Sequence, residues 1–321
     1  MKILTGTLSQ LKQQVDIRRT AVAQNTDVQT IVQAIIAKVR AEGDSALRTY
    51  SNKLDHVTVN DFQVDQALID AAPAQLPSKL LKALQLAKAN ITSYHQNEIE
   101  RGFVDTPNPG IIRGQKITPL AAVGLYVPGG TAAYPSTILM TAIPAKLAGV
   151  KKIVMVTPPQ PGGLNPVVLA AASLAGVDAI YQVGGAQAIA ALAYGTESIP
   201  RVDKIMGPGN RYVAEAKKQV FGNVAIDMIA GPSEIGIIAD ESADPIRLAA
   251  DLLSQAEHDP NARAMMVTPS EKLASAVSEQ IDIQLPTLPR ESIARAAIEN
   301  QGFIAIVATI NDAFSLMNTI A

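Results

Sequence analysis

Apolar residues recur at helical spacing through the first hundred positions. Residues 28–42 carry an apolar residue every three to four positions, with Asp27 in place as an N-cap and Gly43 just past the end. Residues 77–95 repeat this spacing. Residues 111–117 differ, because apolar pairs flank a glycine there, which predicts two short strands around a Gly turn. We therefore expect an N-terminal helical segment that ends in a small β structure.

The pattern changes from about residue 119, where short apolar runs begin to alternate with helical stretches. Strands are expected at 120–127, 152–157, 179–183, 204–206, 224–229, 234–239, 264–268 and 304–307. The stretches between them have helical spacing, and several have cap residues, such as Asn165 before Pro166. This alternation is typical of βαβ units, so we expect an α/β fold in which helices cover both faces of parallel sheets.

Composition narrows the class of protein. The chain has 321 residues, which suits one large or two ordinary domains. Its 27 Lys and Arg nearly balance 29 Asp and Glu, so no basic surface is expected and nucleic acid is excluded as a partner. The absence of cysteine excludes disulfides, thiolate metal sites and a cysteine nucleophile.

No membrane segment is expected. The most apolar region, residues 117–150, is interrupted by several prolines and glycines, whereas a spanning helix needs about 20 predominantly apolar residues. The first residues do not resemble a signal peptide. The expected location is the cytoplasm.

Four glycine-rich turns follow predicted strands, at residues 128–130, 184–185, 207–209 and 231–233. Each alone is best interpreted as an ordinary tight turn, but four within about a hundred residues predict a ligand crevice at the carboxyl ends of the strands. Gln187, Asn210 and Ser233 follow or end three of these turns and are expected to face that crevice. None of the turns matches G-x-G-x-x-G, the standard dinucleotide-binding fingerprint.

A second candidate is the pair Gln255 and His258, spaced i and i+3 at the end of a predicted helix. Both side chains can bind a divalent metal or a polar substrate. Spacing alone favours a histidine that interacts with the helix terminus, because zinc sites normally take three or four protein ligands. The other histidines, His56 and His95, are interpreted as structural or surface residues.

Together these stretches resemble the histidinol dehydrogenase family. The residues that carry the resemblance are 123–130, 183–193, 202–210, 225–228, 230–234 and 251–258, and the similarity extends in register from about residue 18 to residue 321. The resemblance implies two incomplete Rossmann-like domains and a homodimer that exchanges C-terminal segments. We expect residues 1–25 to be an N-terminal arm. Residues 26–120 with 235–321 are expected to form one domain, and residues 121–234 the NAD-binding domain.

The resemblance also implies an activity: NAD-dependent oxidation of L-histidinol through L-histidinal to L-histidine, with one Zn²⁺ per site. It assigns NAD-binding roles to Tyr126, Gln187 and Asn210. It assigns substrate-binding roles to Ser233, Gln255 and His258, with the last two also zinc ligands.

The end of the chain departs from the family pattern. In the family, the segment that matches residues 317–321 leads into a Pro-Glu-His-Leu motif, whose Glu and His are the catalytic acid–base pair. Two further zinc ligands lie beyond that motif. No catalytic residue is therefore assigned within these 321 residues, and we expect this shortened chain to lack turnover. The alternative is a catalytically silent scaffold that binds a nucleotide or an imidazole ligand, and the reading frame beyond Ala321 would distinguish the two.

Overall fold

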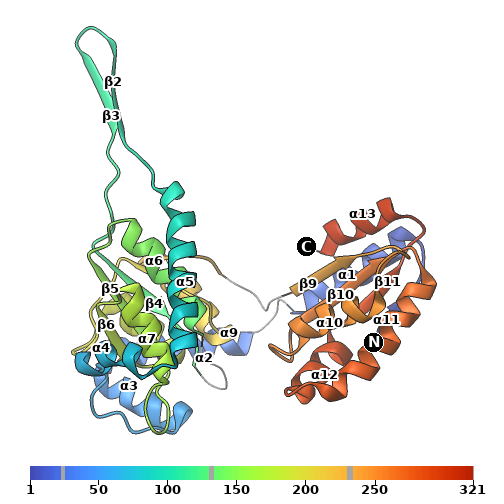
Figure 1. Cartoon of the computed structure of the whole chain (residues 1–321), viewed down its shortest axis with the longest axis horizontal. Helices are drawn as coiled ribbons and strands as arrows, with labels where there is room; N and C mark the ends of the chain where they lie inside the picture. Colours follow the sequence, from blue (N-terminus) through green and yellow to red (C-terminus); the bar gives the residue numbers. More distant parts are fainter. Residues whose placement is uncertain (23–25, 130–133, 230–233, 321) are drawn as a thin grey trace. The chain divides into compact units, whose positions relative to one another are not determined.

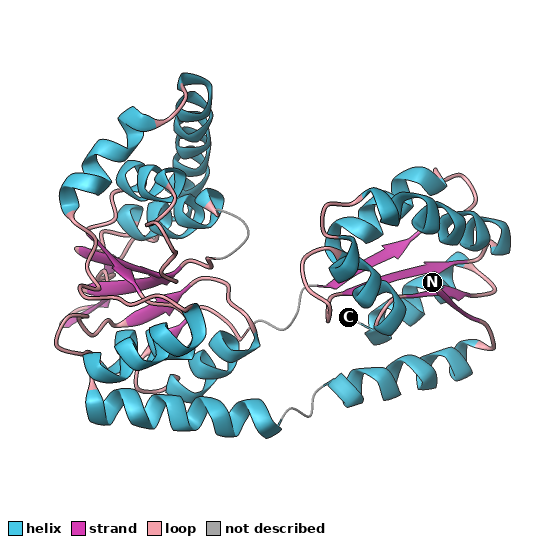
Figure 2. Ribbon diagram, turned by 90° about the horizontal axis from the view of Figure 1, so that it is seen from below, coloured by secondary structure: helices cyan, strands magenta, loops and turns pink. Residues whose placement is uncertain are grey.

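Two compact units make up the computed structural model, which describes residues 1–22, 26–129, 134–229 and 234–320. Unit 1 combines the two ends of the chain, Met1–Thr26 and Gly231–Ala321, and unit 2 is the continuous segment Asp27–Ala230. Each unit contains a parallel sheet covered by helices (Figures 1 and 2). The expected α/β class, with Rossmann-like parallel sheets flanked by helices, is confirmed.

Unit 2 has a five-stranded parallel sheet in the order β6-β5-β4-β7-β8. Its strands are β4 (Ala122–Tyr126), β5 (Lys152–Thr157), β6 (Ala179–Gln182), β7 (Lys204–Met206) and β8 (Ala225–Ile226). The central strands read as unbroken apolar runs because both of their faces are buried. On β5, Ile153 and Met155 face one core, and Val154 and Val156 face the other.

Eight helices cover the two faces of this sheet within the described residues. Helices α2 (Thr26–Glu42), α3 (Asp44–Tyr50), α8 (Gly185–Tyr194) and α9 (Arg211–Val220) pack on one face. Helices α4 (Gln66–Gln75), α5 (Ser78–His95), α6 (Pro135–Leu147) and α7 (Pro166–Ala175) contribute to the core on the other. The expected cap of α7 is present, since the side chain of Asn165 accepts a hydrogen bond from the Val167 N–H at 2.9 Å.

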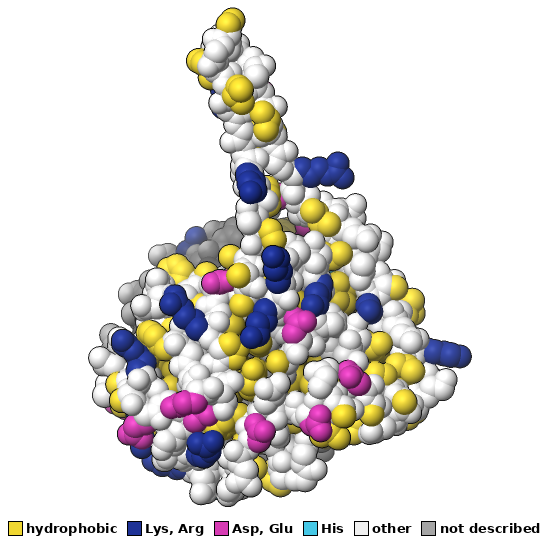
Figure 3. All heavy atoms as spheres, turned by 90° about the vertical axis from the view of Figure 1, so that its left-hand side faces the viewer, with side chains coloured by type: hydrophobic (Ala, Val, Ile, Leu, Met, Phe, Trp, Pro, Cys, Tyr) yellow, Lys and Arg dark blue, Asp and Glu magenta, His cyan; other side chains and the backbone are white. Residues whose placement is uncertain are grey.

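A β-hairpin projects from the body of unit 2 (Figure 3). It consists of β2 (Phe103–Asn108) and β3 (Ile111–Gln115) in antiparallel pairing. The expectation of two strands within 111–117 was wrong. Gly114 lies inside β3, and the turn falls at Pro109–Gly110, where Gly110 has a φ of 82° that suits a residue without a side chain. Large apolar side chains remain exposed on the hairpin, including Val104 at 76% and Ile112 at 77%.

Unit 1 has a four-stranded parallel sheet in the order β1-β11-β10-β9. The strands are β1 (Lys2–Leu4), β9 (Glu234–Ile238), β10 (Arg263–Thr268) and β11 (Phe303–Ile306). Helices α10 (Pro245–Ala256), α11 (Glu271–Gln284) and α12 (Glu291–Asn300) share one core with the sheet. Helices α1 (Leu8–Val22) and α13 (Ile310–Ile320) share the other. None of the helices in the described ranges of either unit has the length and apolar character needed to cross a bilayer.

The compact units divide the chain differently from the expected domains. Residues 27–120 lie in unit 2, because α4 packs along α7, α5 packs against α6, and Gln63 bridges to Tyr181 of β6. Residues 1–25 were expected to be an arm, but β1 pairs with β11 and is part of the unit 1 sheet. The strand expected at 224–229 is only two residues long, since its partner β7 ends at Met206.

Candidate functional site

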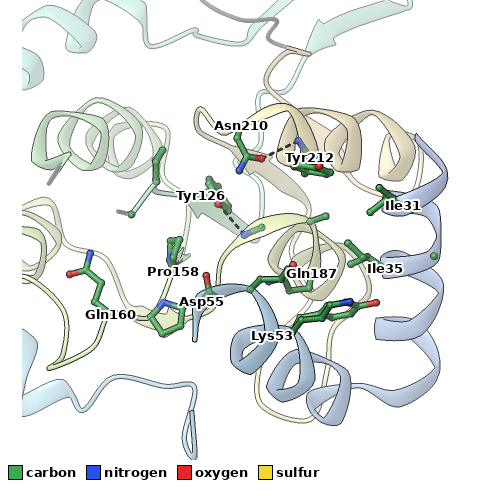
Figure 4. Close-up of a pocket in the computed structure, with 18 of the residues that line it drawn as sticks. Ile31, Ile35, Lys53, Asp55, Tyr126, Pro158, Gln160, Gln187, Asn210 and Tyr212 are labelled. Carbon is green, nitrogen blue, oxygen red and sulfur yellow. Dashed lines mark hydrogen bonds between the residues drawn. The ribbon is translucent and has the colours of Figure 1, made fainter. Parts of the chain in front are cut away.

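The carboxyl ends of the unit 2 strands surround a cavity of about 1070 Å³ (Figure 4). Four of its segments follow strands, namely 128–129 after β4, 158–161 after β5, 185–187 after β6, and the start of α9 after β7. Helix α2 and the turn that follows α3 close the other side. We call this space the sheet-edge cavity. Its position is the one at which open parallel α/β sheets bind ligands.

Tyr126 is the last residue of β4 and is 4% exposed. Its hydroxyl oxygen accepts a hydrogen bond from the Gly185 N–H at 3.1 Å. Burial raises the pKa of Tyr126 to about 12; the Gly185 hydrogen bond opposes this increase and the charge of Asp55 adds to it. The phenol is therefore neutral at physiological pH. Because its oxygen already accepts a hydrogen bond, its proton can be donated to a ligand.

Gln187 lies in the first turn of α8 and is 1% exposed. Its Oε1 atom is buried and has no hydrogen-bond partner within the described parts of the chain. Buried polar atoms normally have a partner, so an orphaned amide oxygen on a cavity wall indicates a position for a ligand donor. The turn before it needs glycine, because a Cβ on Gly184 would lie 2.5 Å from Cγ of Pro158.

Asn210 caps α9 and lines the same cavity. Its Oδ1 atom accepts hydrogen bonds from the N–H groups of Tyr212 at 3.0 Å and Val213 at 3.2 Å. These two hydrogen bonds fix the orientation of the Asn210 side chain. The amide Nδ2 group then lies at the N-terminus of α9, where it can act as a donor. Asn210 therefore caps the helix through Oδ1, while its Nδ2 group has no acceptor among the residues that the structure describes.

The turn before Asn210 is held by an ion pair between a buried lysine and a partly exposed aspartate. Lys217, 3% exposed, donates hydrogen bonds from Nζ to Asp227 and to the carbonyl oxygen of Gly207, the latter at 3.0 Å. Asp227 accepts the Gly207 N–H at 2.8 Å. Gly207 has a φ of 116°, and a Cβ there would lie 2.1 Å from the carbonyl oxygen of Tyr126. The pair thus fixes a turn that only glycine can make.

Among the cavity residues that sequence reasoning missed, Asp55 is the one acidic side chain within the described residues. It ends a π-helical turn, Ser51–Asp55, that extends α3, and the following residue, His56, has a left-handed φ of 56°. The Oδ2 atom of Asp55 is buried without a hydrogen-bond partner among the described residues. Burial raises the pKa of this carboxyl to about 6, against an opposing effect of His56. No motif marks Asp55, because it lies on a helical turn and not on a loop that follows a strand.

The remaining candidates lie in unit 1 or outside the described residues. Gln255 is half-buried in the last turn of α10, and His258 is exposed just beyond that helix. The His258 backbone N–H donates to the carbonyl oxygen of Gln255 at 3.2 Å. Ser233 is outside the described residues. In the described ranges no group of three or more His, Asp or Glu side chains is placed to hold a metal ion.

The structure therefore brings three of the six candidate residues together. Tyr126, Gln187 and Asn210 come from the ends of three different strands and line one cavity. They present neutral donors and an amide oxygen beside the N-termini of α8 and α9, where the positive end of each helix dipole favours a phosphate. Apolar side chains from α2 and the ring of Tyr212 supply a wall against which a flat ring can lie.

Comparisons with known proteins give one consistent result. A family model described as histidinol dehydrogenase matches residues 18–321. The chain is 61% identical over 323 residues to a histidinol dehydrogenase of Lactiplantibacillus plantarum and 55% identical over 326 residues to one of Streptococcus mutans. In both cases the match covers 100% of this chain and 75% of the relative. A crystal structure of histidinol dehydrogenase from Elizabethkingia anophelis matches with a TM-score of 0.89 at 38% identity, covering 100% of this chain and 74% of that one.

Proposed function

Because the chain belongs to the histidinol dehydrogenase family, we propose that its sheet-edge cavity binds NAD for the oxidation of L-histidinol through L-histidinal to L-histidine. This is an oxidoreductase reaction of histidine biosynthesis, and we place it in the cytoplasm. When bound, NAD supplies the hydride acceptor.

One observation carries the proposal for NAD. The three positions to which the sequence resemblance assigns cofactor binding, Tyr126, Gln187 and Asn210, are far apart in the sequence and line a single cavity. The cavity volume of about 1070 Å³ slightly exceeds the roughly 300–1,000 Å³ usual for small-molecule sites, which suits a ligand built of two nucleotides. The orphaned Oε1 atom of Gln187 also requires a donor that the described protein does not supply.

Each of the three side chains has a distinct part in this proposal. Tyr126 stays neutral and donates its hydroxyl proton, while Gly185 fixes the orientation of the phenol. Gln187 accepts a hydrogen bond through Oε1, inside the wall of the cavity. Asn210 donates through Nδ2 while its Oδ1 atom holds the start of α9. None of these groups needs to gain or lose a proton to bind the cofactor.

The described residues do not form a complete zinc site, in contrast to the three residues that line the proposed NAD site. Gln255 and His258 are two neutral donors, whereas zinc sites normally take three or four protein ligands. No group of three or more His, Asp or Glu side chains lies together in the described ranges. The proposed mechanism therefore contains no step through zinc, and the polar roles of Gln255 and His258 toward L-histidinol remain a proposal, as does that of Ser233.

We also propose that the chain forms a homodimer. Four large apolar side chains of the β2–β3 hairpin support this, since Phe103, Val104, Ile111 and Ile112 are all at least 50% exposed, and exposed apolar surface is found at protein–protein contacts. Replacing Val104 and Ile112 with Asp should lower the mass measured by light scattering from that of a dimer to that of a monomer. A wild-type chain that is a monomer at micromolar concentration would contradict the proposal.

The experiment that tests NAD binding is isothermal titration calorimetry of the 321-residue chain with NAD. We expect saturable binding that is weakened by Gln187→Ala and Tyr126→Phe. The matched control is Tyr94→Phe, which alters an exposed tyrosine on α5 outside the sheet-edge cavity. Absence of heat at millimolar NAD, with a folded chain, would refute the assignment of this cavity to the cofactor.

A further inference from the structure

We propose that Asp55 is a cofactor-binding residue whose carboxylate accepts hydrogen bonds from ribose hydroxyl groups of NAD in the sheet-edge cavity. The inference rests on the proposed function, because it concerns the same cavity and the same ligand. It adds an anionic acceptor to Tyr126, Gln187 and Asn210, the three neutral residues already assigned to the cofactor.

The first support is the position of Asp55. It lines the sheet-edge cavity together with Tyr126 and Gln187, although it reaches the cavity from the helical side and not from a strand end. In Figure 4, Asp55 and Gln187 both lie beside the cavity on the side opposite Asn210. The charge of Asp55 also contributes to the raised pKa of Tyr126, in line with the position of both residues on this cavity.

The second support is that Asp55 has no partner of its own. Its Oδ2 atom is buried and receives no hydrogen bond from any described residue. Lys53, on the same turn, also lines the cavity but is exposed and forms no ion pair with Asp55 in the described structure. A buried carboxylate oxygen without a donor is costly, and natural proteins keep such groups where a ligand completes them.

The third support is the backbone that holds Asp55. The π-helical turn Ser51–Asp55 is a rare geometry that occurs frequently at functional sites. His56, directly after it, is the one non-glycine residue with a positive φ among the described residues. An unfavourable backbone next to an unpartnered carboxylate is the pattern expected when the surroundings hold a group in place for binding.

The chemistry of the ligand follows from these features. An ionised carboxylate accepts hydrogen bonds and donates none, so it requires hydroxyl or N–H groups and repels phosphate. In NAD, the ribose hydroxyls are such donors, and carboxylates bind ribose hydroxyls in other dinucleotide sites. The phosphates can then lie toward the N-termini of α8 and α9, away from the carboxylate.

The test compares the wild-type chain, Asp55→Asn and Asp55→Ala by calorimetric titration with NAD. Loss of a hydrogen bond to a charged group predicts that affinity falls about tenfold or more in both variants. The matched control is Asp70→Asn, an exposed carboxylate on α4 that accepts from Gln66 at 2.9 Å outside the cavity. Thermal unfolding of each variant establishes that it is folded.

The pH dependence of binding gives a second readout. Around Asp55 the titratable groups are Lys53 and His56 from its own segment, Tyr126 from β4, and Tyr50 and Tyr212 elsewhere on the cavity wall. Protonation of Asp55 should weaken NAD binding by the wild-type chain as the pH falls from about 7 to about 5, and Asp55→Asn should lose that component.

The outcomes separate this inference from the proposed function. If the wild-type chain binds NAD and both variants bind it with unchanged affinity, Asp55 is not a cofactor-binding residue, while the proposed function stands. If the folded wild-type chain does not bind NAD, the proposed function is refuted and the inference falls with it. Weakened binding in both variants, with Asp70→Asn unchanged, supports both.

Discussion

Lys217 and Asp227 hold Gly207 between them: Lys217 binds its carbonyl oxygen, and Asp227 binds its N–H. The two residues come from α9 and from the segment after β8, so the pair ties both elements to the turn that precedes Asn210. The ion pair thereby connects the interior of unit 2 to the sheet-edge cavity.

Removing the lysine charge should destabilise unit 2. Lys217→Met removes the buried cation that donates to Asp227 and to Gly207, and loss of hydrogen bonds to a charged group costs about 2 kcal/mol of unfolding free energy because Asp227 itself is partly exposed to water. Lys218→Met is the control, because Lys218 is exposed and lies 3.9 Å from Glu215, a contact worth less than about 1 kcal/mol. Urea denaturation of both variants measures the difference. Equal midpoints would show that the pair does not stabilise the fold.

The two roles of Asn210 can be separated by substitution. Asn210→Ala removes the cap of α9 and should cost about 1 kcal/mol of stability while also weakening NAD binding. Asn210→Ser keeps a capping oxygen but lacks the amide donor, so it should retain stability and still bind NAD more weakly. In the full-length form, Asn210→Ala should mainly raise KM for NAD, since loss of uniform binding leaves kcat nearly unchanged. Wild-type NAD affinity in Asn210→Ser would exclude the amide from the site.

The raised pKa of Asp55 leads us to expect that its contribution to stability decreases as the pH rises. Its pKa is about 6 in the folded chain, above the ordinary value of 3.8, so the folded state binds this proton more tightly than the unfolded state. The stabilisation is complete below about pH 4 and is lost as the pH rises through about 6. Without NAD, Asp55→Asn should therefore be more stable than the wild type at about pH 8, by about 1 kcal/mol after allowance for partial solvent screening. Thermal or urea unfolding at that pH measures the difference, and a less stable variant would contradict the burial effect.

Zinc should bind this chain weakly. Gln255 and His258 offer two neutral ligands and no carboxylate or thiolate to balance the charge of the ion. After dialysis, metal analysis should find well under one zinc per chain. Stoichiometric zinc that disappears in His258→Ala would instead reveal further ligands near His258.

The sequence pattern predicted the positions of most sheet strands. It did not predict which helical segments pack into which unit. Strands such as β5 are recognisable because both faces are buried, which produces an unbroken apolar run. The hairpin turn was misplaced because 111–117 contains a glycine at a strand position, Gly114, and local pattern does not set register. The packing of α4 on α7 depends on contacts between segments about a hundred residues apart, which no local periodicity encodes.

The candidate site was predictable where it follows strands. Glycine turns and the family resemblance identified Tyr126, Gln187 and Asn210, since the carboxyl ends of parallel strands meet at one edge. Asp55 was missed because it reaches this edge from a helical turn, and its unpartnered oxygen becomes visible only when the chain is folded.

The pairing of β1 with β11 has a consequence for biosynthesis. Leu4 pairs with Ala305, about 300 residues later, so ribosomes working at about 5–20 residues per second make the partner roughly 15–60 s after the first strand. Unit 2 is one continuous segment and is fully translated before that time. The N-terminal part of unit 1 therefore cannot complete its fold until unit 2 has been synthesised. During that time the apolar side chains of Leu11 and Val15 lack the β10, β11 and α13 residues that bury them in the folded chain.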